Sequence, residues 1–182
     1  KHGHARGWLE RLLESKEIIF HGIYEPDSKR QNQLIESEDK IWKDVKWLKT
    51  REEFLNNKNI KIVFIEESNA SSLEALEFCV ENNKHVMLDK PAGYNYEKLL
   101  KLVEIATAKH LIVEMGYMFR QHDGFSRIAN WSKSGKLGKI FMIRAHMSTN
   151  LPEKNPINNE ISREGLSKFS GGVLYDLGGH ML

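Results

Sequence analysis

The chain has 182 residues, of which 40% are hydrophobic and 29% are charged, and its formal net charge is +2 at pH 7. This composition is typical of a globular protein, and the small charge gives no reason to expect binding to nucleic acid or an anionic membrane. The sequence has no apolar run of membrane-spanning length and no secretory segment near its start, so we expect a cytoplasmic protein. The single cysteine, Cys79, lies in an apolar helical pattern that predicts a small core residue.

Strand-like and helix-like segments alternate over the first two thirds of the chain. In order, the pattern predicts a helix over 8–14, strands over 17–24 and 60–65, a helix over 71–83, a strand over 85–88, a helix over 95–109 and a strand over 111–118. Strands that are continuous apolar runs joined by helices indicate a parallel sheet covered on both faces. We therefore predict an α/β fold with a Rossmann-like, doubly wound parallel sheet over residues 1–118.

The sequence also predicts how two sets of side chains pack. The helix over 95–109 is expected to turn one face inward, made of Tyr96, Leu99, Leu100, Val103 and Ala106. Trp42 and Trp47 are expected to pack together rather than to bind a ligand.

The pattern changes after residue 118. A helix near 122–134 leads to an alternating strand over 139–149 and then to a polar loop over 150–160. We interpret residues 119–182 as the beginning of a second, sheet-containing domain.

Both ends of the chain look cut. A dinucleotide-binding domain begins with a strand and a Gly-rich turn, but here only residues 1–6 precede the first helix. That first strand is central in the usual strand order, so its absence would leave the sheet without its middle. The other end lies two residues past His180, inside a predicted helix. We therefore expect a piece of a longer polypeptide.

Two groups of polar residues follow predicted strands. Glu25 closes the strand over 17–24, where an acid can accept hydrogen bonds from the adenosine ribose and repel a 2′-phosphate, which favours NAD over NADP. The alternative is a turn residue in Glu25-Pro26-Asp27. Ser68 and Asn69 follow the strand over 60–65 and either bind the cofactor or form a polar loop that caps the next helix.

Lys90 stands between Asp89 and Pro91 at the end of the strand over 85–88. Pro91 restricts Lys90 to extended conformations, and an ammonium at this edge can stabilise a developing alkoxide as hydride leaves. The alternative is an ordinary lysine at a strand end. Arg120 and His122 follow the strand over 111–118 and either line the same cleft or form surface ion pairs.

Histidines near the start of the chain raise the question of a metal site. His2 and His4 are two residues apart, close to Arg6, but no third ligand is near them in the sequence. We therefore predict no metal.

The segment G171-G-V-L-Y-D-L-G-G-H180 places an acid, Asp176, four residues before a base, His180. On a helix this spacing puts both side chains on one face. Taken alone, Asp176 could be a residue of the first helical turn, with His180 facing solvent.

Together these features resemble the Gfo/Idh/MocA oxidoreductases, which include glucose–fructose oxidoreductase and inositol 2-dehydrogenase. The resemblance runs across nearly the whole chain. It rests on Glu25, Asn69, H85-V-M-L-D-K-P91, G116-Y-M-F-R120 and G171-G-V-L-Y-D-L-G-G-H180 in that order.

The resemblance implies a Rossmann domain followed by an α/β domain with an open, mainly antiparallel sheet, and a homo-oligomer when the protein is full length. It implies Lys90, Asp176 and His180 as catalytic residues, and a cis bond before Pro91. The implied substrate is a sugar, a cyclitol or a sugar derivative. The implied nicotinamide cofactor is NAD rather than NADP, held by Glu25, Ser68, Asn69, Asp89, Lys90, Pro91 and Arg120.

The chain departs from the family pattern at three places. Asp89 stands where the family has Glu, and Glu67-Ser68-Asn69 stands where the family has Thr-Pro-Asn. The Gly-rich turn is absent from this chain, so residues 1–182 alone are expected to bind NAD poorly and to be inactive.

These expectations lead to one functional hypothesis and one alternative. The hypothesis is an oxidoreductase that transfers a hydride between a nicotinamide cofactor and a secondary alcohol. The alternative is a non-catalytic NAD(H)-binding regulatory protein of the same fold, which would need none of Lys90, Asp176 and His180.

Overall fold

The structure, a computed structural model, describes residues 4–146 and 178–180. Its centre is a sheet of three parallel strands, in the order β3 (Ile62–Ile65), β4 (His85–Leu88) and β5 (Val113–Met115). The register pairs Ile65 with Leu88 and Leu88 with Met115, so the three strands end at the same level. The residues that follow these strands therefore meet at one carboxyl edge of the sheet.

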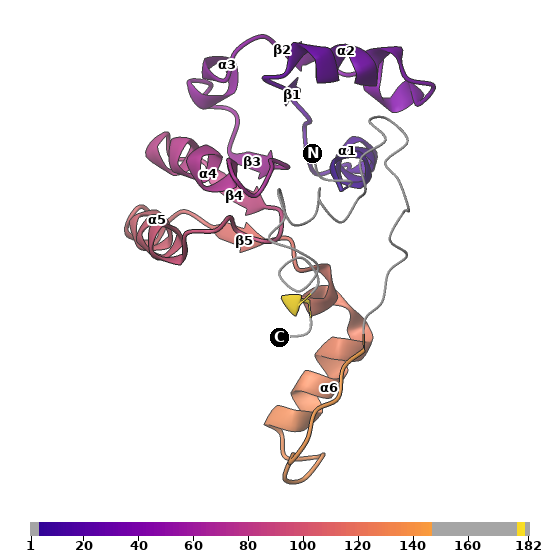
Figure 1. The fold of residues 1–182 in the computed structure, drawn as a ribbon, viewed down its shortest axis with the longest axis vertical. Helices are drawn as coiled ribbons and strands as arrows, with labels where there is room; N and C mark the ends of the chain where they lie inside the picture. The colour runs from indigo at the N-terminus through magenta and orange to yellow at the C-terminus, as the bar shows by residue number, and fades with distance from the viewer. Residues whose placement is uncertain (1–3, 147–177, 181–182) are drawn as a thin grey trace.

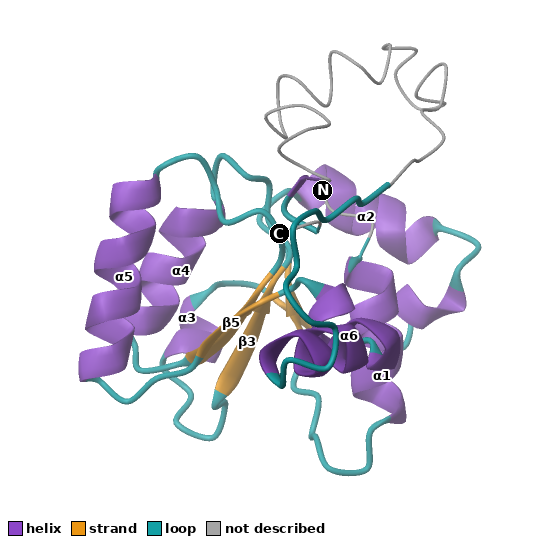
Figure 2. Ribbon diagram, turned by 90° about the horizontal axis from the view of Figure 1, so that it is seen from below, coloured by secondary structure: helices purple, strands orange, loops and turns teal. Residues whose placement is uncertain are grey.

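Helices lie on both sides of this sheet (Figures 1 and 2). The pair α4 (Ser72–Glu81) and α5 (Tyr96–Ala108) packs together on one side, and α1 (Ala5–Glu14) lies on the other. Trp8 of α1 contacts Phe64 of β3, with ring centroids 5.3 Å apart. The predicted parallel α/β fold is confirmed, and each strand is joined to the next through a helix.

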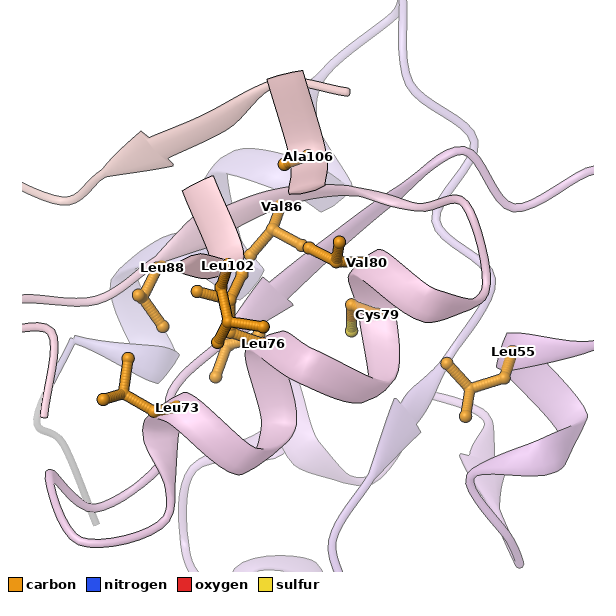
Figure 3. Packing of buried hydrophobic residues seen from close by; sticks show 10 residues of the cluster. Leu55, Leu73, Leu76, Cys79, Val80, Val86, Leu88, Leu102 and Ala106 are labelled. Carbon is orange, nitrogen blue, oxygen red and sulfur yellow. The ribbon is translucent and has the colours of Figure 1, made fainter. Parts of the chain in front are cut away.

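The main core lies between the three-stranded sheet and the α4–α5 pair (Figure 3). Leu76 and Val80 of α4 and Leu88 of β4 are completely buried. The buried members of this cluster are Leu55, Ile65, Leu73, Leu76, Cys79, Val80, Val86, Leu88, Leu102 and Ala106. Cys79 is a core residue, as predicted, and burial raises the pKa of its thiol to about 12.

A second sheet contains only β1 (Ile23–Tyr24) and β2 (Trp47–Leu48), which are parallel. Among the described residues it is separate from the three-stranded sheet. Only the last two residues of the strand predicted over 17–24 form a strand, and β2 was not predicted because its two residues are too few to show periodicity.

The elements between β1 and β3 are short. Besides β2 they are α2 (Ser28–Glu36), the 3-10 helix η1 (Lys40–Trp42) and α3 (Glu52–Leu55). Trp42 and Trp47 pack together as predicted, with centroids 6.4 Å apart, and the Trp47 indole Nε1 donates a hydrogen bond to the Trp42 carbonyl.

The inward face predicted for the helix over 95–109 is partly wrong. Tyr96, Leu100 and Val103 are exposed, whereas Leu102 and Ala106 are buried. The helix carries apolar residues on more than one face, so its periodicity fits two rotations, and packing against α4 selects the one that buries Leu102 and Ala106.

Beyond β5, the 3-10 helix η2 (Met118–Gln121) leads into α6 (Asp123–Lys133), which projects away from the sheet (Figure 1). Residues 139–146 form no strand, although an alternating strand was predicted over 139–149, and Phe141 and Ile143 are exposed. A strand needs a hydrogen-bonding neighbour, and this segment has none among the described residues. The proposed boundary at residue 118 stays a prediction.

No helix in the described part of the chain has both the length and the apolar character needed to cross a membrane.

The core makes a direct stability prediction. Leu76→Ala removes a completely buried side chain and should lower the free energy of unfolding by about 2–5 kcal/mol, because it leaves a cavity between α4 and the sheet. The matched control is Leu100→Ala on α5, whose side chain is exposed and whose loss should cost less than about 1 kcal/mol. Urea unfolding followed by circular dichroism measures both. Equal losses in the two variants would contradict this placement of the core.

Candidate active site at the carboxyl edge of the sheet

Asp89, Lys90 and Pro91 follow directly after β4. All three are buried, with Asp89 exposed by 6% and Lys90 by 4%. The peptide bond between Lys90 and Pro91 is cis, as the family resemblance implied. The structure therefore puts an acid and a base in the interior, at the edge where ligands bind in open parallel sheets.

His4 lies next to Asp89, although 85 residues separate them in the chain. It occupies the N-cap position of α1, and its Nδ1 lies 3.1 Å from each oxygen of the Asp89 carboxylate. The hydrogen bond to Asp89 raises the pKa of the His4 imidazole, while burial and the positive charge of Lys90 oppose that shift. His4 is therefore one group that stabilises the buried charge of Asp89.

Glu66 is the third member of this group and follows directly after β3. Its Oε2 is buried and has no hydrogen-bond partner among the described residues. Burial, reinforced by the negative charge of Asp89, raises the pKa of the Glu66 carboxyl to about 8. Ligand atoms of His4, Glu66 and Asp89 all lie within 4.8 Å of one another.

The polar residues that follow Glu66 are ordered by local contacts. The Ser68 and Ser71 hydroxyls are 2.8 Å apart, and Ser71 donates a hydrogen bond to Glu67. Asn69 is buried, with 3% exposure, and its backbone carbonyl accepts a hydrogen bond from the Ser72 hydroxyl. These contacts order the loop before α4, and the role of Ser68 and Asn69 in cofactor binding stays a prediction.

Glu25 lies directly after β1, as predicted, and its side chain is 21% exposed. One carboxylate oxygen accepts a hydrogen bond from the Asp27 amide and the other lies 3.2 Å from Nε of Arg30. A carboxylate has about four lone-pair sites, so Glu25 keeps capacity to accept hydrogen bonds from ribose hydroxyls. An acceptor at this position fits the ribose of a dinucleotide, and the role of Glu25 in cofactor binding stays a prediction.

Residues that follow β5 contact His180, which lies in the described segment 178–180. Gly116 lies against Asp89, since a Cβ at Gly116 would be 3.1 Å from the carboxylate. The rings of Tyr117 and Phe119 both meet the imidazole of His180 edge to face, at centroid distances of 5.6 and 5.2 Å. A chain of contacts therefore runs from Asp89 through Gly116 and Tyr117 to His180.

Gly179 is needed for this arrangement. A Cβ at this position would lie 2.7 Å from the Tyr117 hydroxyl, which is too close for any other residue without movement. The second predicted catalytic residue of the motif, Asp176, lies outside the described residues. Arg120 is exposed in η2, and no described contact draws it toward Asp89.

Sequence reasoning missed the contributions of His4, Glu66 and the aromatic pair around His180. Glu66 carried one usable signal, because it is an acid placed directly after a buried strand. His4 carried none, since its partners are far away in the sequence.

The separate parallel strands, their helical crossovers and the polar carboxyl edge define a dinucleotide-binding fold of the Rossmann class. Residues 4–117 match the model of the oxidoreductase family with an NAD-binding Rossmann fold, so the chain belongs to the Gfo/Idh/MocA family.

Individual relatives agree with this assignment. The chain is 27% identical over 128 residues to an oxidoreductase from Rhizobium meliloti, covering 70% of this chain and 36% of that protein. It is 26% identical over 105 residues to inositol 2-dehydrogenase from Salmonella typhimurium, covering 56% of this chain and 31% of the relative. The chain thus spans about a third of the length of these curated relatives.

Solved structures share the fold. An NAD-binding protein from Listeria innocua superposes with a TM-score of 0.74 at 20% identity, covering 99% of this chain and 48% of that one. The scyllo-inositol dehydrogenase from Lactobacillus casei, solved with NAD(H) and scyllo-inositol, gives a TM-score of 0.62 at 15% identity, covering 76% and 40%.

The His4–Asp89 hydrogen bond makes a testable contribution to stability. His4→Ala removes a hydrogen bond to a buried carboxylate and should lower the free energy of unfolding by about 1–3 kcal/mol. His4→Asn should recover part of that loss, because the asparagine Nδ2 can donate to Asp89 from a similar position. Urea unfolding at pH 7 in the presence of a chelator measures both variants. If His4→Ala is as stable as the parent chain, this hydrogen bond does not hold α1 against β4.

Proposed function

We propose that the whole protein is an NAD-dependent oxidoreductase that oxidises a secondary alcohol of a sugar, cyclitol or sugar derivative to the carbonyl compound. The observation that carries this proposal is the burial of Lys90 beside Asp89 at the end of β4, linked by contacts through Gly116 and Tyr117 to His180. Membership of an oxidoreductase family supports it. The names of the inositol dehydrogenase relatives support the substrate class.

Each residue has a specific role in this proposal. His180 accepts the proton of the substrate hydroxyl, because an imidazole titrates near neutral pH. Lys90 holds the same oxygen and stabilises the alkoxide as it develops. Asp176 orients the substrate or His180. The nicotinamide cofactor, when bound, supplies the acceptor for the hydride that leaves the carbinol carbon.

The surroundings of Lys90 and His180 suit these roles. Burial of Lys90 keeps water away from the ammonium, and a charge acts more strongly where water is excluded. The edge-to-face contacts of Tyr117 and Phe119 fix the plane of the His180 ring, so its nitrogens point in defined directions. The homo-oligomeric state and cytoplasmic location remain predictions that accompany this function.

The reaction is tested by following the absorbance of reduced nicotinamide while NAD is offered with a panel of inositols and sugars. In the full-length protein, Lys90→Met and His180→Asn should each lower turnover by about two to four orders of magnitude, because each removes a group that handles the reacting oxygen. Lys101→Met, on the exposed side of α5, is the matched control and should keep parental turnover. Unchanged rates in both site variants would exclude this mechanism, and NAD binding without turnover on any substrate would favour the regulatory alternative.

Cofactor preference gives a separate prediction. Glu25 is expected to repel the 2′-phosphate of NADP, and Arg30 stands within ion-pair distance of its carboxylate. Glu25→Ser removes the repulsion and frees the guanidinium, so the ratio of NADP to NAD affinity in the full-length protein should rise by about ten-fold or more. Fluorescence titration with both cofactors measures the ratio. Asp27→Ser, two residues away, is the control and should leave the ratio unchanged; a similar ratio in Glu25→Ser would remove Glu25 from the cofactor site.

A further inference from the structure

Three residues from distant parts of the chain converge at the carboxyl edge with metal-ligating atoms. His4 begins α1, Glu66 follows β3 and Asp89 follows β4. Their ligand atoms all lie within 4.8 Å of one another. No local sequence pattern groups them, because His4 and Glu66 are 62 positions apart and Glu66 and Asp89 are 23 positions apart.

Contacts within the cluster do not satisfy every polar atom, although both His4 and Glu66 bond to Asp89. His4 Nδ1 lies 3.1 Å from both oxygens of Asp89, which accounts for these two side chains. It leaves Glu66 Oε2 buried and without a hydrogen-bond partner among the described residues. A buried polar atom without a partner is costly, so a ligand that engages this oxygen would complete the cluster.

The chemistry of the three side chains selects the ligand. An imidazole nitrogen beside two carboxylate oxygens is a donor set that suits zinc and similar divalent transition ions, whereas Mg²⁺ and Ca²⁺ prefer oxygen alone. Zinc sits about 2.0–2.2 Å from nitrogen and oxygen ligands. Two ligands in a tetrahedral site are then about 3.3 Å apart, close to the 3.1 Å between His4 and Asp89.

We propose that His4, Glu66 and Asp89 form a binding site for one Zn²⁺ ion. Zinc binding displaces the proton that the raised pKa of Glu66 keeps on its carboxyl at neutral pH, so that two carboxylates then match the charge of the dication. Glu66 Oε2 gains the partner that it lacks. The ion would join the start of α1 to the ends of β3 and β4. Three protein ligands leave a fourth tetrahedral position open, as in zinc sites that also hold water. Asp89 precedes Lys90, so the ion would lie beside the proposed catalytic lysine without replacing it.

The test titrates Zn²⁺ into the chelator-treated chain and follows binding by competition with a chromophoric chelator. We expect one Zn²⁺ per chain with micromolar or tighter affinity, and an increase in the melting temperature when zinc is added. Mg²⁺ at the same concentration should produce neither effect. The assay needs no NAD and no substrate, so its result is independent of the proposed oxidoreductase activity.

Conservative variants separate this site from other zinc ligands in the chain. Glu66→Gln keeps the size of the side chain, and His4→Asn keeps a donor to Asp89, so both should fold while losing a ligand. Loss of an outer-shell group already weakens metal binding by about 10–100-fold, so each variant should weaken it by at least about ten-fold. The matched control is Glu67→Gln, which changes the neighbouring carboxylate that accepts a hydrogen bond from Ser71.

Two results would overturn the proposal. The first is the absence of zinc binding at micromolar concentration in the parent chain. The second is binding that persists unchanged in Glu66→Gln, which would assign the ion to histidines such as His2 and His4 in the terminal segment rather than to the three-residue cluster. Circular dichroism of each variant confirms that any loss of binding is not a loss of fold.

Discussion

The parallel register of β3, β4 and β5 is the constraint on which the site depends. Ile65, Leu88 and Met115 are aligned across the sheet, so the residues after each strand must share one edge. The buried contacts of Leu76 and Val80 hold α4 against the sheet and maintain this alignment. A slip of one residue in β4 would turn Val86 and Leu88 to the opposite face and move Asp89 and Lys90 away from Glu66.

Burial of charge at that edge gives the site its electrostatic character. Asp89 and Lys90 are both nearly inaccessible to solvent, and Glu66 has one fully buried oxygen. Burial of the Glu66 carboxyl, reinforced by the negative charge of Asp89 beside it, raises its pKa to about 8. The hydrogen bond to Asp89 also raises the pKa of His4, because the charged form of the imidazole is the one that Asp89 stabilises. Buried charged groups this close together suit both a reaction centre and a bound cation. The proposed active site and the proposed zinc site therefore lie at the same edge of the sheet.

The proposed oxidoreductase chemistry and the proposed zinc site place different demands on neighbouring residues. Catalysis needs Lys90 and His180 to reach one substrate oxygen, whereas zinc binding needs His4, Glu66 and Asp89 to converge. Asp89 links the two groups, since it precedes Lys90 and lies against Gly116, which leads to Tyr117 and His180. An ion held by Asp89 would fix the position of the backbone from which Lys90 projects.

The sequence by itself determined the parallel α/β class, because continuous apolar strands at 62–65 and 85–88 and the apolar stripe of α4 depend only on local periodicity. It also predicted Lys90 as a candidate catalytic residue, since a lysine between a strand end and a proline is a local pattern. The rotation of α5, the absence of a strand over residues 139–146 and the pairing of β1 with β2 depended on which surfaces were available for packing. Only the tertiary structure decided that His4 meets Asp89 and Glu66, because contacts between residues 62 to 85 positions apart leave no periodic trace in a single sequence.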